Sequence, residues 1–336
     1  MLAGIMRPSL HILSYSRFVR SKGGVFMYIP LFLLGLALVV LSSDAFVDAA
    51  ARLARRLRIS DMIIGATIVS LGTTLPELTV SATASAKGLA DMAAGNLIGS
   101  VICNTALIAG LSQSIRPAAS LSPDFKANYL FFFLSAAIFG FFAVSELGFS
   151  RFSGLCLLVL LACYLYWSWQ RAKKTSPSGK QPLPLKKGSV FSDLLITVLA
   201  VMALAFGAKL LVENGSRLAL AIGIPEHVIS ISMIALGTSL PELITSITAL
   251  VKGHAALSLG NVIGANILNL LMVCGVSSVI RPLTLAPSLL RIDLPVMFTV
   301  SLLLALPGIL KKRLYRWQGF ALLAVYAGYM AYLYFL

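Results

Sequence analysis

Long apolar stretches follow one another along most of this chain, and each is close to the length of a membrane-spanning helix. About 20 apolar residues are enough to cross the hydrocarbon core of a bilayer as an α-helix. The pattern predicts about ten spans, near 27–47, 61–86, 90–115, 127–147, 151–171, 191–213, 225–251, 254–279, 291–310 and 316–336. The expected fold class is therefore an all-α polytopic membrane protein.

Two of these stretches contain nearly the same polar segment. Leu71-Gly-Thr-Thr-Leu-Pro-Glu-Leu78 returns 165 residues later as Leu236-Gly-Thr-Ser-Leu-Pro-Glu-Leu243. The alignment of 71–117 with 236–282 needs no gap, and about half of the aligned positions are identical. A carboxylate inside a membrane is costly and is retained mainly for function. Glu77 and Glu242 are therefore the first candidate functional residues.

The repeat divides the chain into two halves of five expected spans. The first half is 27–171, with its repeat at 61–117, and the second is 190–336, with its repeat at 225–282. Because five is an odd number, the halves enter the membrane from opposite sides, which is the inverted-repeat plan of many secondary transporters. Between them, segment 172–189 is rich in Lys, Pro, Ser and Gly and is expected to be a flexible linker.

Composition supports a membrane protein, since 58% of the residues are hydrophobic, only 12% are charged and the mean hydropathy is +0.92. The net charge of +15 is carried by short basic clusters between the apolar stretches. Such clusters set the orientation of membrane proteins and do not indicate nucleic-acid binding.

The side of the membrane that holds the linker has the larger number of Lys and Arg residues, so the linker is expected to be cytoplasmic and both termini to face outward. Segment 1–26 is basic and precedes the first span. It is expected to be an N-terminal extension, either a mis-assigned start or a weak targeting segment.

Each copy of the polar segment combines groups that could bind a cation. Pro76 has no N–H, so the carbonyl group of Gly72 loses its helical partner. Thr73, Thr74 and Glu77 lie within about one helical turn and can share a face. Carbonyl, hydroxyl and carboxylate oxygens suit hard cations such as Ca²⁺ or Na⁺, and the set lacks the nitrogen and sulfur ligands that zinc or copper favour.

Each residue type, taken alone, also has a purely structural explanation. A proline can simply kink a helix, and Thr or Ser can bond back to its own backbone. A glutamate can form a buried ion pair, but neither motif contains a Lys or Arg. Further along each repeat, Ser100 and Asn104 are four residues apart and present oxygens on one face. Asn96 and Asn261 are equally compatible with cation ligation and with hydrogen bonding between helices.

With these motifs, the sequence resembles the cation/calcium exchanger superfamily, specifically its prokaryotic sodium/calcium exchanger branch. The resemblance rests on the segments 72–77 with 95–100 and 237–242 with 260–264, and it covers nearly the whole chain. It implies ion sites clustered at mid-membrane, with the carboxylates of Glu77 and Glu242 as shared ligands. The other implied ligands are the side chains of Thr73, Thr74, Thr238, Ser239, Ser100, Asn104 and Asn269, and the backbone carbonyls of Ser70 and Ala235.

Two positions depart from the family pattern. Ala265 stands where many members have serine, and Asn269 where some members have aspartate. Two carboxylates still balance one Ca²⁺ without a proton, so the resemblance implies exchange of Ca²⁺ for Na⁺ by alternating access. Ca²⁺/H⁺ exchange and K⁺-dependent exchange are the alternatives, and a cation channel is a more remote one.

The expected location is the plasma membrane of a prokaryote, with Ca²⁺ and Na⁺ as transported substrates. No cofactor, nucleic acid or protein partner is implied, and the lipid bilayer is the expected surroundings. The sequence contains neither HExxH nor GxSxG, and no histidine is placed to activate a serine, so an intramembrane enzyme is not expected.

Overall fold

The computed structural model describes residues 22–118, 123–174, 189–222 and 237–335, and within these ranges the chain is almost entirely helical. The first half contains α2 (Lys22–Leu57), α3 (Asp61–Ile64), η1 (Gly65–Val69), α4 (Ser70–Thr73), α5 (Leu75–Ala86), α6 (Ala90–Ile102), η2 (Cys103–Ala109), α7 (Gly110–Ile115), α8 (Pro123–Ser145), β1 (Gly148–Phe149) and α9 (Arg151–Lys174). The second half contains α10 (Val190–Ala221), α12 (Leu240–Val251), α13 (Ala255–Leu268), η3 (Asn269–Val273), α14 (Cys274–Ile280), β2 (Leu283–Thr284), η4 (Leu289–Asp293), α15 (Leu294–Lys311) and α16 (Arg316–Phe335).

Elements η1 to η4 are π-helical turns inside longer helices. They join α3 to α4, α6 to α7 and α13 to α14, and η4 begins the helix that continues as α15. The two strands are only two residues long and pair antiparallel, which ties the α8–α9 connection to the segment after α14.

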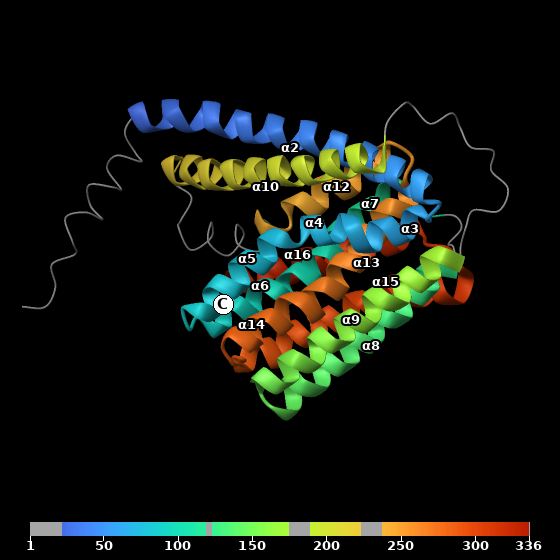
Figure 1. The fold of residues 1–336 in the computed structure, drawn as a ribbon. Coiled ribbons are helices and arrows are strands. Elements are labelled where there is room, and N and C mark those ends of the chain that lie inside the picture. Colours follow the sequence, from blue (N-terminus) through green and yellow to red (C-terminus); the bar gives the residue numbers. More distant parts are fainter. Residues whose placement is uncertain (1–21, 119–122, 175–188, 223–236, 336) are drawn as a thin grey trace, which may run out of the picture.

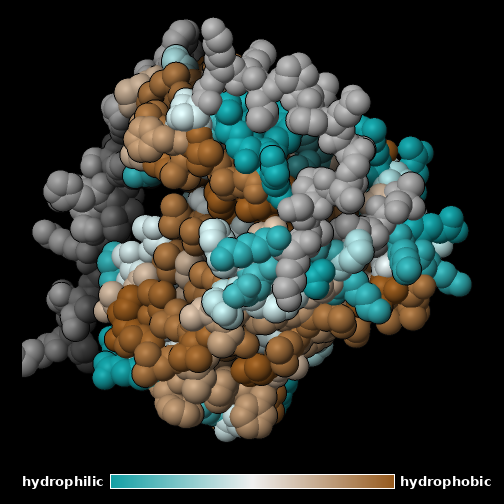
Figure 2. All heavy atoms as spheres, turned by 45° about the vertical axis from the view of Figure 1, so that its right-hand side comes forward, coloured by the Kyte–Doolittle hydropathy of each residue, from teal (hydrophilic) through white to brown (hydrophobic). Residues whose placement is uncertain are grey.

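The all-α polytopic membrane fold predicted from the sequence is confirmed. Seven helices within the described ranges are long and apolar enough to cross a membrane, or eight if the bent pair 61–73 and 75–86 is one span. Two of the ten expected spans do not meet that criterion: α16, and α12 with the preceding residues 223–236, which lie outside the described ranges. Large apolar side chains such as Leu41 and Phe191 are exposed, as lipid-facing positions are, and Figure 2 shows broad hydrophobic areas on the outer surface.

Two helices are longer than the hydrophobic pattern predicted. The first span was expected near 27–47, but α2 runs from 22 to 57, and the sixth was expected near 191–213, but α10 runs from 190 to 221. In both cases the extra turns contain polar residues, which hydropathy alone assigns to loops. The start of α2 falls inside the expected extension 1–26, of which residues 1–21 lie outside the described ranges, as do residues 175–188 of the expected linker.

Helices α2 and α10 lie side by side along one side of the bundle, and α8 and α9 lie on the opposite side (Figure 1). The backbones of α2 and α10 approach closely where both helices have glycine. A Cβ atom on Gly35 would lie 2.7 Å from the backbone N of Leu211, and one on Gly207 would lie 2.8 Å from Cβ of Leu38. Small residues permit such contacts between membrane helices.

An ion-pair cluster adds to the contact between α2 and α10. Asp193 of α10 accepts from Arg52 Nε at 2.7 Å and from Arg56 Nε at 2.5 Å, both on α2. The carboxylate is nearly buried, so each arginine bond is stronger than an exposed ion pair. The two helices therefore form one packed unit, which we call the α2–α10 pair.

Helices α6 and α13 occupy the centre of the bundle. Their apolar windows are 78% and 83% buried, against 28% for α2 and 33% for α10. The glycine pair of α13 packs directly on another backbone: a Cβ atom on Gly260 would lie 2.4 Å from the carbonyl O of Met62, and one on Gly264 would lie 2.5 Å from Cα of Ala66. Gly260 and Gly264 have the GxxxG spacing, which permits such close backbone contacts between membrane helices.

Candidate cation-binding site

Each proline motif ends one helix and begins the next. Thr74 (φ −82°, ψ −1°) separates α4 from α5, and the helices before and after it are bent by 46°. Ser239 (φ −88°, ψ 7°) precedes α12 in the same way. Pro76 cannot donate to the helical hydrogen-bond ladder, so the chain starts a new helix there. Glu77 and Glu242 consequently lie in the first turn of a helix, where the helix dipole favours negative charge.

The two carboxylates are completely buried, and each is bound by the opposite repeat. Ser239 Oγ donates to Glu77 Oε1 at 3.2 Å, and Thr74 Oγ1 donates to Glu242 Oε1 at 3.4 Å. Ser239 is also 3.2 Å from Ser100 Oγ. Among the described residues, neither carboxylate has a Lys, Arg or His partner within 4 Å. The structure therefore brings both acids to one place without a basic residue to neutralise them.

Asn96 links three helices beside Glu77. Its amide nitrogen donates to the carbonyl O of Glu77 at 3.3 Å and to Ser81 Oγ at 2.9 Å. Its amide oxygen accepts from Thr238 Oγ1 of the other repeat at 3.1 Å. The amide thus fixes the first turn of α5 on α6 and connects both to the second repeat.

Asn261 makes the equivalent bonds in the second repeat. Its amide nitrogen reaches the carbonyl O of Glu242 at 3.5 Å and Ser246 Oγ at 3.1 Å, and its oxygen accepts from Thr73 Oγ1 at 3.1 Å. Of the two roles left open for Asn96 and Asn261, the structure shows the hydrogen-bonding role between helices for both. The matching set of bonds is what a two-fold relation between the repeats requires.

Asn104 and Asn269 differ from that pair. Asn104 is the second residue of the π-helical turn η2, Asn269 is the first residue of η3, and both are completely buried. Neither atom of either amide head has a hydrogen-bond partner among the described residues, and the same is true of Oε2 of Glu77 and of Glu242. Buried polar groups are nearly always bonded, so these oxygens are the ones best suited to bind a ligand. π-Helical turns are frequent at functional sites.

The remaining candidates from the sequence lie close by, with one exception. Ser70 and Ser100 are completely buried, but the Ser70 carbonyl already accepts from Thr73 Oγ1 at 3.3 Å and from the N–H of Thr74 at 2.9 Å. Ala235 lies outside the described residues.

The sequence reasoning missed several polar residues near the motifs. Thr245 is completely buried one turn after Glu242, and its hydroxyl has no partner among the described residues. Asn266 Nδ2 donates to Thr105 Oγ1 at 2.8 Å, which joins α13 to η2. Neither position has a polar counterpart in the other repeat, so the symmetry that revealed the motifs could not reveal these residues.

The site is chemically a set of oxygen atoms. The two carboxylates and hydroxyl groups from both repeats meet in a buried region, and the amide heads of Asn104 and Asn269 are completely buried as well. Within the described residues, three or more His, Cys, Asp or Glu side chains never come together, so the soft-ligand sites typical of zinc and copper are not formed there. Hard cations prefer oxygen ligands of this kind.

Comparison with known proteins places this geometry in a family. A family model described as sodium/calcium exchanger protein matches residues 27–170 and 192–335, one match in each half. An uncharacterized membrane protein of Methanocaldococcus jannaschii is 36% identical over 88% of this chain and 94% of its own length. The sodium/calcium exchanger MaX1 of Methanosarcina acetivorans is 30% identical over 90% of this chain and 97% of its own.

A solved structure shows the same fold. The structure of the sodium-calcium exchanger NCX_Mj, soaked with Na⁺ and Sr²⁺, superposes with a TM-score of 0.80 at 34% sequence identity. The match covers 91% of this chain and 99% of that chain.

The hydrogen bonds of Asn96 and the lack of such bonds at Asn104 predict unequal losses of stability for the same substitution. Asn96→Leu removes three buried hydrogen bonds: those that the amide nitrogen donates to the carbonyl O of Glu77 and to Ser81 Oγ, and the one that the amide oxygen accepts from Thr238 Oγ1. It should lower the free energy of unfolding by about 2–4 kcal/mol. Asn104→Leu on the same helix removes an amide that bonds to nothing described, and should change that free energy by less than about 1 kcal/mol.

The measurement is unfolding by SDS in mixed micelles, in choline chloride buffer with EDTA so that neither Na⁺ nor Ca²⁺ contributes. Equal losses of stability in the two variants would contradict the division of the asparagines into bonded and unbonded pairs.

Proposed function

The chain belongs to the sodium/calcium exchanger family, and we propose that it is a secondary antiporter that exchanges Ca²⁺ for Na⁺ by alternating access. It is an integral membrane protein, and the family consists of membrane exchangers rather than enzymes. The observation that carries the proposal is the reciprocal bonding of Glu77 and Glu242. Each acid is held by a hydroxyl of the opposite repeat, so one site contains both charges.

In this proposal the two carboxylates are the shared anionic ligands of the transported cations. Their free oxygens, Oε2 of each glutamate, point to no other described partner. The proposed hydroxyl ligands are Thr73, Thr74, Thr238, Ser239 and Ser100, the amide ligands are Asn104 and Asn269, and the backbone ligands are Ser70 and Ala235. Thr73 and Thr238 would join the carboxylates at Ca²⁺, and Thr74 and Ser239 at Na⁺.

Coupling follows from competition for these oxygens. Two carboxylates can be balanced by one divalent cation or by monovalent cations, but one set of ligands cannot hold both at full occupancy. Either load neutralises charge that is otherwise costly in a bilayer, which favours movement of the loaded carrier. The proposed moving part is the α2–α10 pair, whose apolar windows are much less buried than those of the central helices α6 and α13.

The family and the charge distribution also support an orientation. We propose a prokaryotic plasma membrane, with the linker 172–189 in the cytoplasm and both termini outside. The proposed functional halves are 27–171 and 190–336, which agree closely with the two ranges of the family match.

One observation favours a second candidate. Asn269 supplies an amide where some members of the family have a carboxylate, so the site contains two acids. Fewer fixed negative charges leave room for a different coupling ion, and proton-coupled or K⁺-dependent exchange is therefore the alternative. Ca²⁺ flux into liposomes under separately imposed Na⁺, K⁺ and H⁺ gradients distinguishes the three. Uptake driven by a pH gradient without sodium would exclude the leading proposal.

Removal of one carboxylate tests the site directly. Glu77→Gln keeps the shape of the side chain and its bond from Ser239 but removes a charge that the cation needs. Na⁺-dependent ⁴⁵Ca²⁺ uptake in proteoliposomes should fall at least ~100-fold, which corresponds to about 2.7 kcal/mol.

The matched control is Glu146→Gln. Glu146 is an exposed acid in the α8–α9 connection, where it accepts from the N–H of Ser150 at 2.7 Å, and glutamine can still accept that bond. Its uptake should stay within about twofold of the unmodified protein. Equal uptake by Glu77→Gln and the unmodified protein would refute the assignment.

A further inference from the structure

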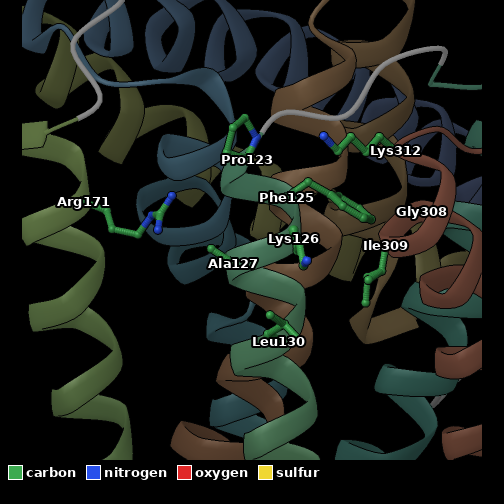
Figure 3. Close-up of a pocket in the computed structure, with 9 residues that line it drawn as sticks. All are labelled: Pro123, Phe125, Lys126, Ala127, Leu130, Arg171, Gly308, Ile309 and Lys312. Carbon is green, nitrogen blue, oxygen red and sulfur yellow. The ribbon is translucent and has the colours of Figure 1, made fainter.

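A cleft with a volume of about 550 Å³ lies at the ends of α8, α9 and α15, away from the carboxylates (Figure 3). Its lining includes Phe125, Lys126, Leu130, Arg171, Ile309 and Lys312. The lining contains three basic side chains and not one acidic side chain. Phe125, Leu130 and Ile309 give it an apolar part.

The basic side chains of the cleft are not equivalent. Arg171 donates to Asp124 at 3.0 Å and lies over the Trp167 ring, 5.4 Å from its centroid, so its charge is partly balanced. Lys126 and Lys312 are exposed, and the described part of the chain places no carboxylate within 4 Å of either. Two positive charges are therefore available to a ligand.

The cleft lies at the boundary between the membrane and water. Helix α8 begins at 123, α15 ends at 311 and α9 ends at 174, so the cleft lies where three apolar helices reach the aqueous boundary. Toward the membrane interior, exposed leucines continue from the cleft: Leu130 and Leu134 on α8 and Leu306 on α15. Basic residues above an apolar strip match a lipid headgroup above its acyl chain.

We propose that this cleft binds an anionic phospholipid, with the headgroup phosphate between Lys126 and Lys312 and an acyl chain along the leucines of α8. A phosphatidylcholine headgroup carries a cation of its own, which the lysines would repel. Basic pockets between transmembrane helices on the cytoplasmic side are suited to anionic headgroups, and the basic clusters of this chain assign the cleft to that side.

The test is lipid titration of the detergent-purified full chain, followed by native mass spectrometry. Dioleoyl phosphatidylglycerol should bind at least about tenfold more tightly than dioleoyl phosphatidylcholine. The double variant Lys126→Gln/Lys312→Gln should lose about 25-fold in phosphatidylglycerol affinity, at roughly fivefold per lysine. Both lysines are exposed, so the substitutions should not impair folding, and thermal unfolding confirms that.

The control Lys87→Gln/Lys209→Gln removes the same charge from exposed positions elsewhere and should bind as the unmodified protein does. Equal affinity for the two lipids, or an equal loss in the control, overturns the proposal. Displacement of the lipid by millimolar glycerol 3-phosphate would also overturn it, because the occupant would then be a soluble phosphate.

A second inference comes from an ion-pair cluster at Lys252, in the turn between α12 and α13. Its Nζ lies 2.7 Å from Oδ1 of Asp44 and 2.7 Å from Oδ1 of Asp48, both on α2. Ser43 Oγ donates to Thr248 Oγ1 at 3.0 Å beside it. Burial lowers the pKa of Lys252, but the bonds to the two aspartates outweigh it and raise the pKa, so the lysine stays charged. This cluster fastens the α2–α10 pair to the bundle at one membrane face.

The repeat relation defines what should exist at the other face. With the constant offset of 165 residues, Lys252 corresponds to Lys87, Asp48 to Glu213 and Asp44 to Lys209. Among the described residues, Lys87 has no ion pair, and Glu213 instead lies 3.8 Å from Lys209 on its own helix. Because the halves are inverted, Lys87 and Lys252 lie at opposite faces. Among the described residues, the Lys252–Asp48 ion pair is therefore formed at one face, and the equivalent Lys87–Glu213 ion pair is not formed at the other.

We further infer that Lys252 and Lys87 alternately hold the α2–α10 pair at opposite membrane faces. This inference rests on the proposed alternating access. The Lys252–Asp48 pair would hold one face closed, and movement of the helices would break it and form Lys87–Glu213 at the other face. The Asp193 cluster makes both acids move together, since it fixes α10 to α2.

Hydrogen–deuterium exchange of the full chain in nanodiscs tests this without any transport measurement, so its failure is separable from failure of the exchange function. Lys252→Gln should speed exchange of backbone amides around 251–254 by about 3–5-fold and slow exchange around 86–89. Lys87→Gln should leave 251–254 unchanged. The swapped variant Lys252→Asp/Asp48→Lys should restore protection. Unchanged exchange in Lys252→Gln, or no rescue by the swap, overturns the inference.

Discussion

The structure depends on one constraint: polar groups buried in an apolar bundle must be satisfied by one another or by a ligand. Two carboxylates at its centre have no described basic partner, and each accepts a hydroxyl hydrogen bond from the opposite repeat. This requirement brings α4, α5 and α12 to one point and makes the helix breaks necessary. The glycine contacts of α13 then allow the backbones to approach closely enough for the bonds to form.

The site is symmetric in its supporting bonds and asymmetric in its remaining groups. Asn96 and Asn261 make matching bonds, whereas Ser100 is opposed by Ala265, and Thr245 has no hydroxyl counterpart. The charged positions differ as well, since α2 has Asp44 and Asp48 where α10 has Lys209 and Glu213. A protein that alternates between two faces needs the same framework for both. It does not need equal energies, and these differences are where the two faces can be made unequal.

Sequence alone predicted the helical class, the duplicated halves, the helix breaks and the buried acids, because each leaves a local and repeated pattern. It could not assign the role of Asn96, since an amide both donates and accepts and only its neighbours decide how it is used. The π-helical turns at Asn104 and Asn269 have no local sequence signal, because an extra residue per turn is imposed by packing. The Asn266–Thr105 bond was missed because it occurs once, so the repeat gave no second copy to compare.

Each of the two asparagines accepts a hydrogen bond from a threonine of the other repeat, and this arrangement also affects how such a chain can evolve. Asn96 is completed by Thr238, and Asn261 by Thr73, so each half of the gene encodes the missing partner of the other. A change in one copy is therefore harmful unless the distant copy changes with it. The two repeats are identical at these positions, as this mutual dependence requires.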